Sequence, residues 1–247
     1  MIKNKMQRIC GDKKYFMNKN NKLGQGEEGT IYEACSFENS RFHCDRAVKI
    51  VPLYYNSSFD EIAAELKIGP SIFIRKCPEE DRTYFVLEKL SGTLQSYLRD
   101  HVLTDNDKKQ LQSLLFRTIN DGKFFHNDLH SENIMYKKHG SKKTFYLIDF
   151  SMSTFIGDVG RRNFKRKILK NSKIEDLDAK KDIQLLSEEQ IQYLYNTYCP
   201  QQEYSKKEEE RKKKREQVMR VARKEMTHKL ENATFHKKQK TTTRKNG

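Results

Sequence analysis

The chain has 247 residues, which is enough for one domain of two lobes or for two small domains. Hydrophobic residues make up 35% of it and charged residues 34%, so we expect an economical core and a strongly hydrated surface. The net charge of +15 is concentrated in residues 205–247, which hold 16 Lys and Arg against six Asp and Glu. This distribution predicts a charged tail and excludes a generally basic fold.

The sequence contains no apolar run long enough to span a membrane, and no hydrophobic leader follows Met1. Its five cysteines are scattered, odd in number and never arranged as C-x-x-C. We therefore expect reduced thiols in an intracellular protein, without zinc or a disulfide framework. The cysteines are Cys10, Cys35, Cys44, Cys77 and Cys199.

The first informative motif is a G-x-G-x-x-G pattern at Gly24, Gly26 and Gly29. A dinucleotide-binding turn has the same spacing, but there a helix follows the glycines. Here residues 30–35 are β-prone, so the pattern predicts a hairpin whose backbone N–H groups can lie over phosphates. Two carboxylates at its tip, Glu27 and Glu28, are expected to face solvent or to meet a basic substrate.

A lysine in the next apolar strand, Lys49, is placed to meet nucleotide phosphates. A helix is expected over residues 57–66, with Ser58 and Glu61 in capping-box spacing. Glu65 lies one turn further on and is the first choice as the carboxylate that holds Lys49, with Glu61 the second.

The rest of the chain to residue 148 predicts a strand and a mainly helical region. Residues 83–90 have the composition of a strand. Helices are expected over 93–98 and over 104–122, the second with Thr104 as its N-cap. A hairpin is expected over 134–148, and it would bring the ends of two polar motifs together.

The central motif is His126-Asn127-Asp128-Leu129-His130-Ser131-Glu132-Asn133, followed by Asp149 at the end of an apolar strand. Each polar residue alone is a common turn residue. Together they have the layout of a phosphoryl-transfer site. In that layout Asp128 receives the hydroxyl proton, while Asn133 and Asp149 hold Mg²⁺ against the phosphates of ATP.

These motifs resemble the eukaryotic-type protein kinase superfamily over about residues 19–186. The likeness points to compact, divergent kinases such as the haspin-like, Bud32-like and large-DNA-virus enzymes. It implies an α+β fold with a small β-rich N-lobe and a reduced, mainly helical C-lobe, using ATP and Mg²⁺. The nucleotide contacts that it implies come from Gly24, Gly26, Gly29, Ile31, Ala47, Lys49, Leu87, Glu88 and Leu90.

Four positions depart from the superfamily pattern or match it weakly. Asn127 replaces an Arg that meets an activation-loop phosphate, which implies that such phosphorylation is not needed. His130 stands where Ser/Thr kinases have Lys, and Ser151 replaces the Gly of Asp-Phe-Gly. Asp182 matches either a buried Asp on a central helix that braces the catalytic loop or a surface helix residue. The basic run 160–170 would occupy the activation segment.

The resemblance favours an ATP-dependent kinase of Ser/Thr hydroxyls in proteins, with Asp128, Lys49 and Glu65 as its catalytic residues. A small-molecule kinase of the aminoglycoside or choline type and a catalytically silent pseudokinase scaffold stay open. We expect a monomer in the cytoplasm or nucleus that binds no membrane and contacts nucleic acid or an acidic partner through its tail. The expected parts are an extension (1–17), an N-lobe (18–90), a C-lobe (91–200) and the tail (201–247).

Overall fold

The computed structural model describes residues 6–199 and Lys213. One compact unit ends at Tyr198, and Cys199 begins a second unit. The predicted tail, residues 201–247, thus lies outside the described residues apart from Lys213. Among the described helices, none is long and apolar enough to cross a membrane.

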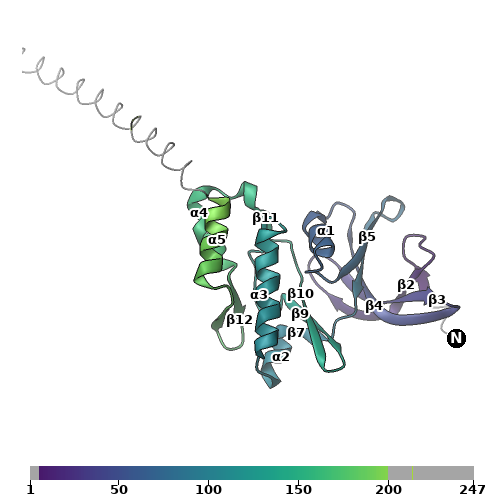
Figure 1. Cartoon of the computed structure of the whole chain (residues 1–247). Helices are drawn as coiled ribbons and strands as arrows, with labels where there is room; N and C mark the ends of the chain where they lie inside the picture. The colour runs from purple at the N-terminus through teal and green to yellow at the C-terminus, as the bar shows by residue number, and fades with distance from the viewer. Residues whose placement is uncertain (1–5, 200–212, 214–247) are drawn as a thin grey trace, which may run out of the picture. The chain divides into compact units, whose positions relative to one another are not determined.

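The N-terminal half is built around a six-stranded sheet in the order β1-β2-β3-β4-β6-β5, with every neighbouring pair antiparallel (Figure 1). Residues 6–17, expected to be an extension, contribute β1 and the start of β2 to this sheet. Helix α1 packs against β5. The elements are β1 (Met6–Arg8), β2 (Tyr15–Gln25), β3 (Thr30–Glu38), β4 (Arg41–Pro52), α1 (Ser58–Glu65), β5 (Ser71–Cys77), η2 (Pro78–Glu80) and β6 (Arg82–Glu88).

Strand pairing fixes which side chains share a face of this sheet. Lys49 in β4 lies opposite Ile31 in β3 and Phe85 in β6. Side chains alternate along a strand, so Val48 points to the other face, where it joins a buried cluster with Met17 and Val86. Lys49 therefore lies on the face of the sheet that is turned away from this cluster.

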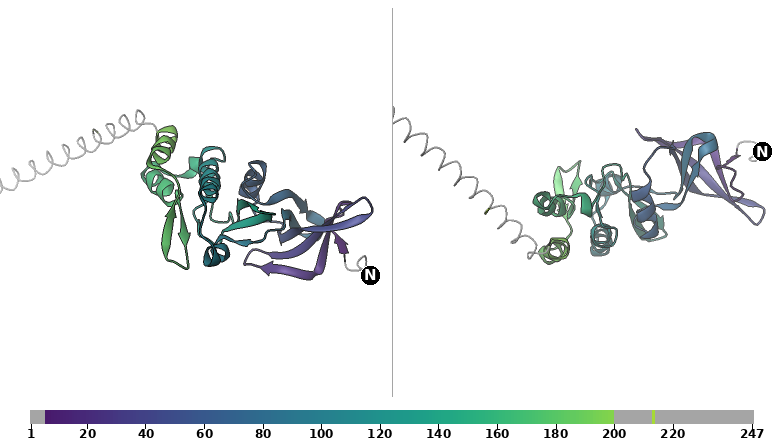
Figure 2. Two further views of the ribbon diagram at one scale, coloured as in Figure 1. Left: turned by 60° about the horizontal axis from the view of Figure 1, so that its bottom comes forward. Right: turned by 90° about the horizontal axis from the view of Figure 1, so that it is seen from above.

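The C-terminal half is mainly helical and carries three small sheets, ordered β10-β9-β7, β11-β8 and β12-β13. Helices α4 and α5 lie side by side in all views (Figures 1 and 2). The elements are β7 (Gly92–Thr93), α2 (Leu94–Asp100), α3 (Asp105–Asn120), β8 (Phe124–Phe125), β9 (Ile134–His139), β10 (Lys142–Leu147), β11 (Thr154–Phe155), η3 (Ile156–Asp158), α4 (Arg161–Lys170), β12 (Lys173–Asp176), β13 (Lys181–Gln184) and α5 (Glu188–Tyr198).

Local sequence rules gave one helix start correctly and the other incorrectly. Thr104 caps α3 as predicted, and its hydroxyl and Asp107 form a reciprocal capping box. The capping box expected at Ser58 of α1 is absent. Ser57 stands at the N-cap without a side-chain cap bond, and its hydroxyl donates to the Glu61 carboxylate at 2.6 Å.

The 134–147 hairpin is bonded both to the segment between the halves and to the N-terminal half. The amide of Ser91, in that segment, donates to Tyr136 O at 2.7 Å, and the amide of Leu147 donates to Ile68 O at 2.8 Å. The second bond joins the two halves directly. The two-lobed α+β architecture predicted from the sequence is confirmed.

The prediction of reduced thiols was wrong for four of the five cysteines. Disulfides join Cys10 to Cys77 and Cys35 to Cys44, while Cys199 is free. The first disulfide ties the segment after β1 to the end of β5, and the second links the neighbouring strands β3 and β4. The first pairing requires the two edge strands of the sheet, β1 and β5, to come together, and the second depends on the register of the β3-β4 hairpin. Cysteine spacing alone reveals neither.

Candidate functional site

The glycine hairpin forms between β2 and β3 as predicted. The amide of Gly26 donates to Gly29 O at 3.0 Å and closes the turn. A Cβ added to Gly29 would lie 2.1 Å from the carbonyl oxygen of Ile50, so the turn approaches β4 more closely than any side chain at this position allows. Gly24 and Gly26 lie in open space.

The expected partner of Lys49 was wrong. Its Nζ lies 3.0 Å from Oε2 of Glu28, at the tip of the glycine hairpin. Glu65 is the last residue of α1 and is exposed, while Glu61 interacts with Ser57. Glu28 thus meets a cation of its own chain, which differs from the expectation of solvent or a basic substrate.

A partly buried carboxylate on α1, Asp60, lies close to Lys49 and was missed from the sequence. Burial raises the pKa of Asp60 to about 6, an increase that the nearby charge of Lys49 and a hydrogen bond from Tyr55 reduce. The Tyr55 hydroxyl donates to Asp60 at 3.3 Å. Asp60 falls in the first turn of α1 beside Glu61, and no sequence signal distinguished the two as neighbours of Lys49.

Tyr55 shows that residues of both halves face one space. Its ring centroid lies 5.3 Å from Lys49 Nζ. Burial raises the pKa of Tyr55, and the negative charges of Asp60, Glu28 and Asp149 raise it further. Asp149 belongs to the C-terminal half, so Tyr55 lies beside the Lys49 ammonium and within the electrostatic influence of the Asp149 carboxylate.

The predicted catalytic-loop residues Asp128 and Asn133 are in direct contact. The Asn133 amide donates to Asp128 Oδ2 at 2.9 Å and to the Asp128 backbone carbonyl at 3.0 Å. Because Nδ2 makes both bonds, the Asn133 side-chain oxygen is directed elsewhere. His130 Nε2 lies 3.5 Å from Asp128 Oδ2, and the Asp128 side chain is 45% exposed, as a group that meets a substrate must be.

Asp149 follows β10 with a left-handed backbone, φ 61°, a conformation that Asp tolerates better than most residues. The amide of Ile148 donates to Asn133 O at 3.0 Å, so Asp149 lies next to the catalytic loop. Ser151 Oγ donates to Asp149 Oδ1 at 2.7 Å. The departure from Asp-Phe-Gly thus gives the carboxylate a hydrogen bond that glycine does not offer.

His126 is a structural residue, as expected. It is completely buried, and its Nε2 lies 2.9 Å from Ile148 O. Burial lowers the pKa of His126, so the neutral ring donates from Nε2 to that carbonyl. This bond holds the start of the catalytic loop against the strand that carries Asp149.

Asn127, the residue in place of the expected Arg, is buried and joins several segments. Its side-chain amide donates to Met152 O at 2.8 Å and to Thr154 Oγ1 at 3.0 Å. Its oxygen accepts from Lys167 Nζ at 2.6 Å, and its backbone N–H donates to Asn171 Oδ1 at 2.9 Å. The amide thereby attaches the segment after Asp149 and helix α4 to the catalytic loop.

Residues predicted to contact adenine lie at the end of β6 and in β4, and some of their polar groups are already hydrogen-bonded. The amide of Glu88 donates to Pro70 O at 2.9 Å, and its carboxylate accepts from Arg46 and Lys137. Leu87 pairs with Ala47 across β6 and β4. Ala47 and Leu87 lie at alternate positions to Val48 and Val86, and therefore on the Lys49 face of the sheet.

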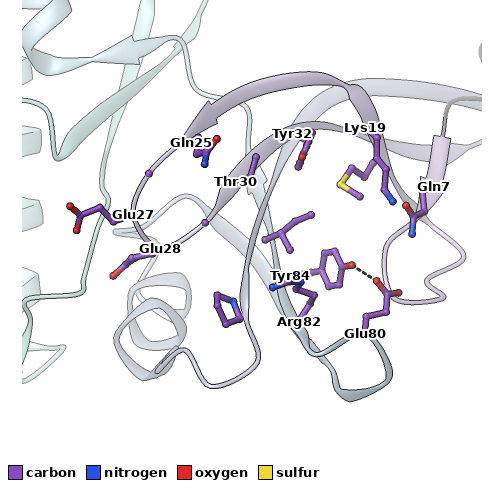
Figure 3. Close-up of a pocket in the computed structure, with 15 residues that line it drawn as sticks. Gln7, Lys19, Gln25, Glu27, Glu28, Thr30, Tyr32, Glu80, Arg82 and Tyr84 are labelled. Atoms are coloured by element: carbon purple, nitrogen blue, oxygen red, sulfur yellow. Dashed lines mark hydrogen bonds between the residues drawn. The ribbon is translucent and has the colours of Figure 1, made fainter.

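A hollow of about 470 Å³ lies on the opposite face of the same sheet. Tyr32 and Tyr84 contribute to its wall, with Glu27 and Glu28 at one end and Gln7 and Lys19 at the other (Figure 3). Its lining residue Ile50 adjoins Lys49 in β4 and points away from it. The hollow therefore lies on the other face of β4 from Lys49, and Glu28 at its end is the lining residue that pairs with Lys49.

Asp182 does not brace the catalytic loop from a helix. It lies in strand β13 and pairs with Lys173 of β12. The β12-β13 hairpin contacts the loop through backbone bonds: Ser131 N–H donates to Glu175 O at 2.8 Å, and Glu175 N–H donates to Leu129 O at 3.0 Å.

Comparison with known proteins agrees with this geometry. Residues 86–184 match the ABC1 atypical kinase-like domain family. Residues 86–184 are thus similar to a kinase-like domain. The match covers the catalytic loop and Asp149 but less than half of the chain, and no curated protein matches the sequence. The narrower likeness to haspin-like, Bud32-like or viral kinases stays a prediction.

Proposed function

We propose that the protein is an ATP-dependent kinase that transfers the γ-phosphoryl group to Ser or Thr hydroxyls of proteins. In the proposed reaction the acceptor oxygen bonds to the γ-phosphorus, the bond from that phosphorus to the β–γ bridging oxygen breaks, and ADP leaves. Asp128 orients the hydroxyl and takes its proton. The observation that carries this proposal is the 2.9 Å bond from Asn133 to Asp128, beside Asp149.

The donor groups fit Mg²⁺, which prefers carboxylate and amide oxygens. Asn133 uses its nitrogen for Asp128, so its oxygen is available to a cation. Asp149 uses Oδ1 for Ser151, so Oδ2 is available as well. When bound, Mg²⁺ would neutralise phosphate charge.

Lys49 needs a new arrangement when phosphates bind. Its ion pair with Glu28 puts a carboxylate where phosphate oxygens would bind. Phosphates would displace Glu28 by like-charge repulsion, leaving Asp60 as the nearby carboxylate that can hold the ammonium. We therefore assign to Asp60 the role first given to Glu65.

The adenine contacts follow from which backbone groups are already used. The Glu88 N–H is bonded to Pro70 O, so Glu88 would offer its carbonyl and Leu90 its N–H. Leu87, Ala47 and Ile31 would contact the base through their apolar surfaces.

A small-molecule kinase is the second candidate, and the short C-terminal half favours it. Between Asp149 and Tyr198 the described chain forms only two α-helices, α4 and α5, which leaves little surface for docking a protein. Phosphorylation of an amino-alcohol or aminoglycoside, but of no protein, would support this candidate.

The deciding test incubates the full chain with γ-labelled ATP, Mg²⁺ and generic protein substrates, and in parallel with amino-alcohols and aminoglycosides. We expect label on protein Ser or Thr. Asp128→Asn should reduce the rate by about 10²- to 10⁴-fold, and Lys49→Met should also reduce it. Equal background rates in wild type and both variants would contradict the proposal and favour a silent scaffold.

A further inference from the structure

Helix α4 is fixed to the catalytic loop by buried contacts. Phe164 and Ile168 are 2% and 0% exposed and form its inner face. Lys167 donates to the Asn127 side-chain oxygen at 2.6 Å, and Asn171 at the end of the helix accepts from the Asn127 backbone N–H. Asn127 is the residue before Asp128, so these hydrogen bonds fix α4 close to the proposed catalytic aspartate.

The outer face of α4 carries four exposed cations, Arg162, Lys165, Arg166 and Lys170. Across the described residues 6–199, none of them forms an ion pair with a carboxylate, and the helix itself contains no acidic residue. Asp158, three residues before α4 begins, is likewise not paired with it. The face is therefore positively charged without compensation from the described part of the chain.

The pKa of Lys167, on the same helix, shows the effect of these positive charges. Burial lowers the pKa of Lys167, and the positive charges of Lys170 and Arg166 lower it further. The cations thus repel one another across the helix, and a negative group bound at this face would relieve that repulsion.

We propose that the outer face of α4 binds acidic side chains of a protein substrate while its acceptor hydroxyl lies at Asp128; this inference rests on the function proposed above. The contacts from Asp128 through the Asn127 and Lys167 side chains span about 16 Å at most as far as the backbone of α4, and the outer cations lie one helix diameter, about 10 Å, beyond it. An extended chain advances about 3.3 Å per residue. The favoured Asp or Glu residues would therefore lie up to about eight positions from the acceptor.

An acidic protein segment suits this face better than a nucleic acid does. Single-stranded nucleic acids are bound by cations together with exposed aromatic rings that stack on bases. The one aromatic residue of α4, Phe164, is buried. The exposed apolar neighbour is Leu169, 45% exposed, which can contact an aliphatic side chain of a peptide.

The test compares two Ser peptides with the same acceptor, one with Glu and one with Gln at the fourth to eighth positions on both sides. Arg166→Glu/Lys170→Glu is the test variant. Lys108→Glu/Lys109→Glu on α3 changes the net charge equally at two exposed positions away from α4 and is the control. We expect wild type and control to prefer the Glu peptide, and the test variant to lose about tenfold in kcat/KM for it through a raised KM.

Peptide binding, measured by fluorescence anisotropy without ATP, separates this inference from the proposed function. If binding of the Glu peptide weakens about tenfold in the test variant alone, the surface is supported even when no peptide is phosphorylated. Equal affinity for both peptides, or equal loss in test and control variants, would overturn it. Binding of oligouridylate that the test variant alone loses, with no peptide preference, would assign the face to nucleic acid and also overturn it.

Discussion

Asp60 offers a quantitative test of the electrostatics around Lys49, because its folded pKa is raised to about 6 from 3.8. The folded protein holds this proton more tightly than the unfolded chain, so ionisation of Asp60 destabilises the fold. The cost is absent well below pH 3.8, grows as the pH rises, and is complete above about pH 6. The two-unit shift corresponds to about 3 kcal/mol at pH 8 and about half of that at pH 5.

Asp60→Asn removes the charge and keeps the shape, and its amide oxygen can still accept from Tyr55. We therefore expect the variant to gain up to about 3 kcal/mol in free energy of unfolding at pH 8, and about half as much at pH 5. Urea denaturation of wild type and variant at both pH values, without nucleotide, measures this.

Asp107→Asn is the matched control with the opposite sign. Burial alone would raise the pKa of Asp107, but hydrogen bonds from Lys143 and from Thr104 outweigh it and lower the pKa. Its charge therefore stabilises the fold at neutral pH, so this variant should be destabilised at pH 8, and less so as the pH falls through the folded pKa. A loss of stability in Asp60→Asn at pH 8, or a gain that does not change with pH, would refute the reasoning.

Three further outcomes are expected. Glu28→Gln should lower the KM for ATP by up to about fivefold, because Lys49 is freed and a negative charge leaves the phosphate site; steady-state kinetics measures it. Asn127 has φ 67°, which glycine adopts without strain. Asn127→Gly should therefore lose about 2 kcal/mol of stability through its side-chain bonds alone, and hydrogen exchange should rise in residues 152–171. Replacing Cys10 and Cys77 by Ser should cost about 4 kcal/mol in urea denaturation, because the disulfide spans 67 positions.

Two of these have a matched comparison, and each has an outcome that would contradict it. Glu27→Gln, at the same hairpin tip, should leave the KM for ATP nearly unchanged, and an equal decrease would argue against a specific pair with Lys49. Unchanged exchange in 152–171 would show that Asn127 does not hold that segment. Removal of the Cys35–Cys44 disulfide, with a separation of nine positions, should cost about 3 kcal/mol, so a larger cost there would contradict the loop-length argument.

Features set by neighbouring residues could be predicted from the sequence. The hairpins around Gly26 and Gly140 follow from turn residues between β-prone runs, and the α3 cap at Thr104 follows from spacing of three. In each case the information lies within a few residues of the feature.

Features set by distant residues could not be predicted. The pair of Lys49 with Glu28 depends on how far the hairpin tip folds over β4, and the contacts of Asn127 reach residues 40 and 44 positions away. Asp60 precedes Glu61 by one residue, and only the orientation of α1 decides which of them faces the sheet. The Cys10–Cys77 disulfide likewise required the edge strands β1 and β5 to come together.

The central claim is that Lys49, Asp128, Asn133 and Asp149 surround one magnesium-bound nucleotide. Isothermal titration of ATP into wild type and Asp149→Asn, with and without Mg²⁺, tests it most directly. The account predicts tighter binding with Mg²⁺ in wild type and loss of that enhancement in the variant. An identical Mg²⁺ effect in both proteins, or no ATP binding by either, would contradict it.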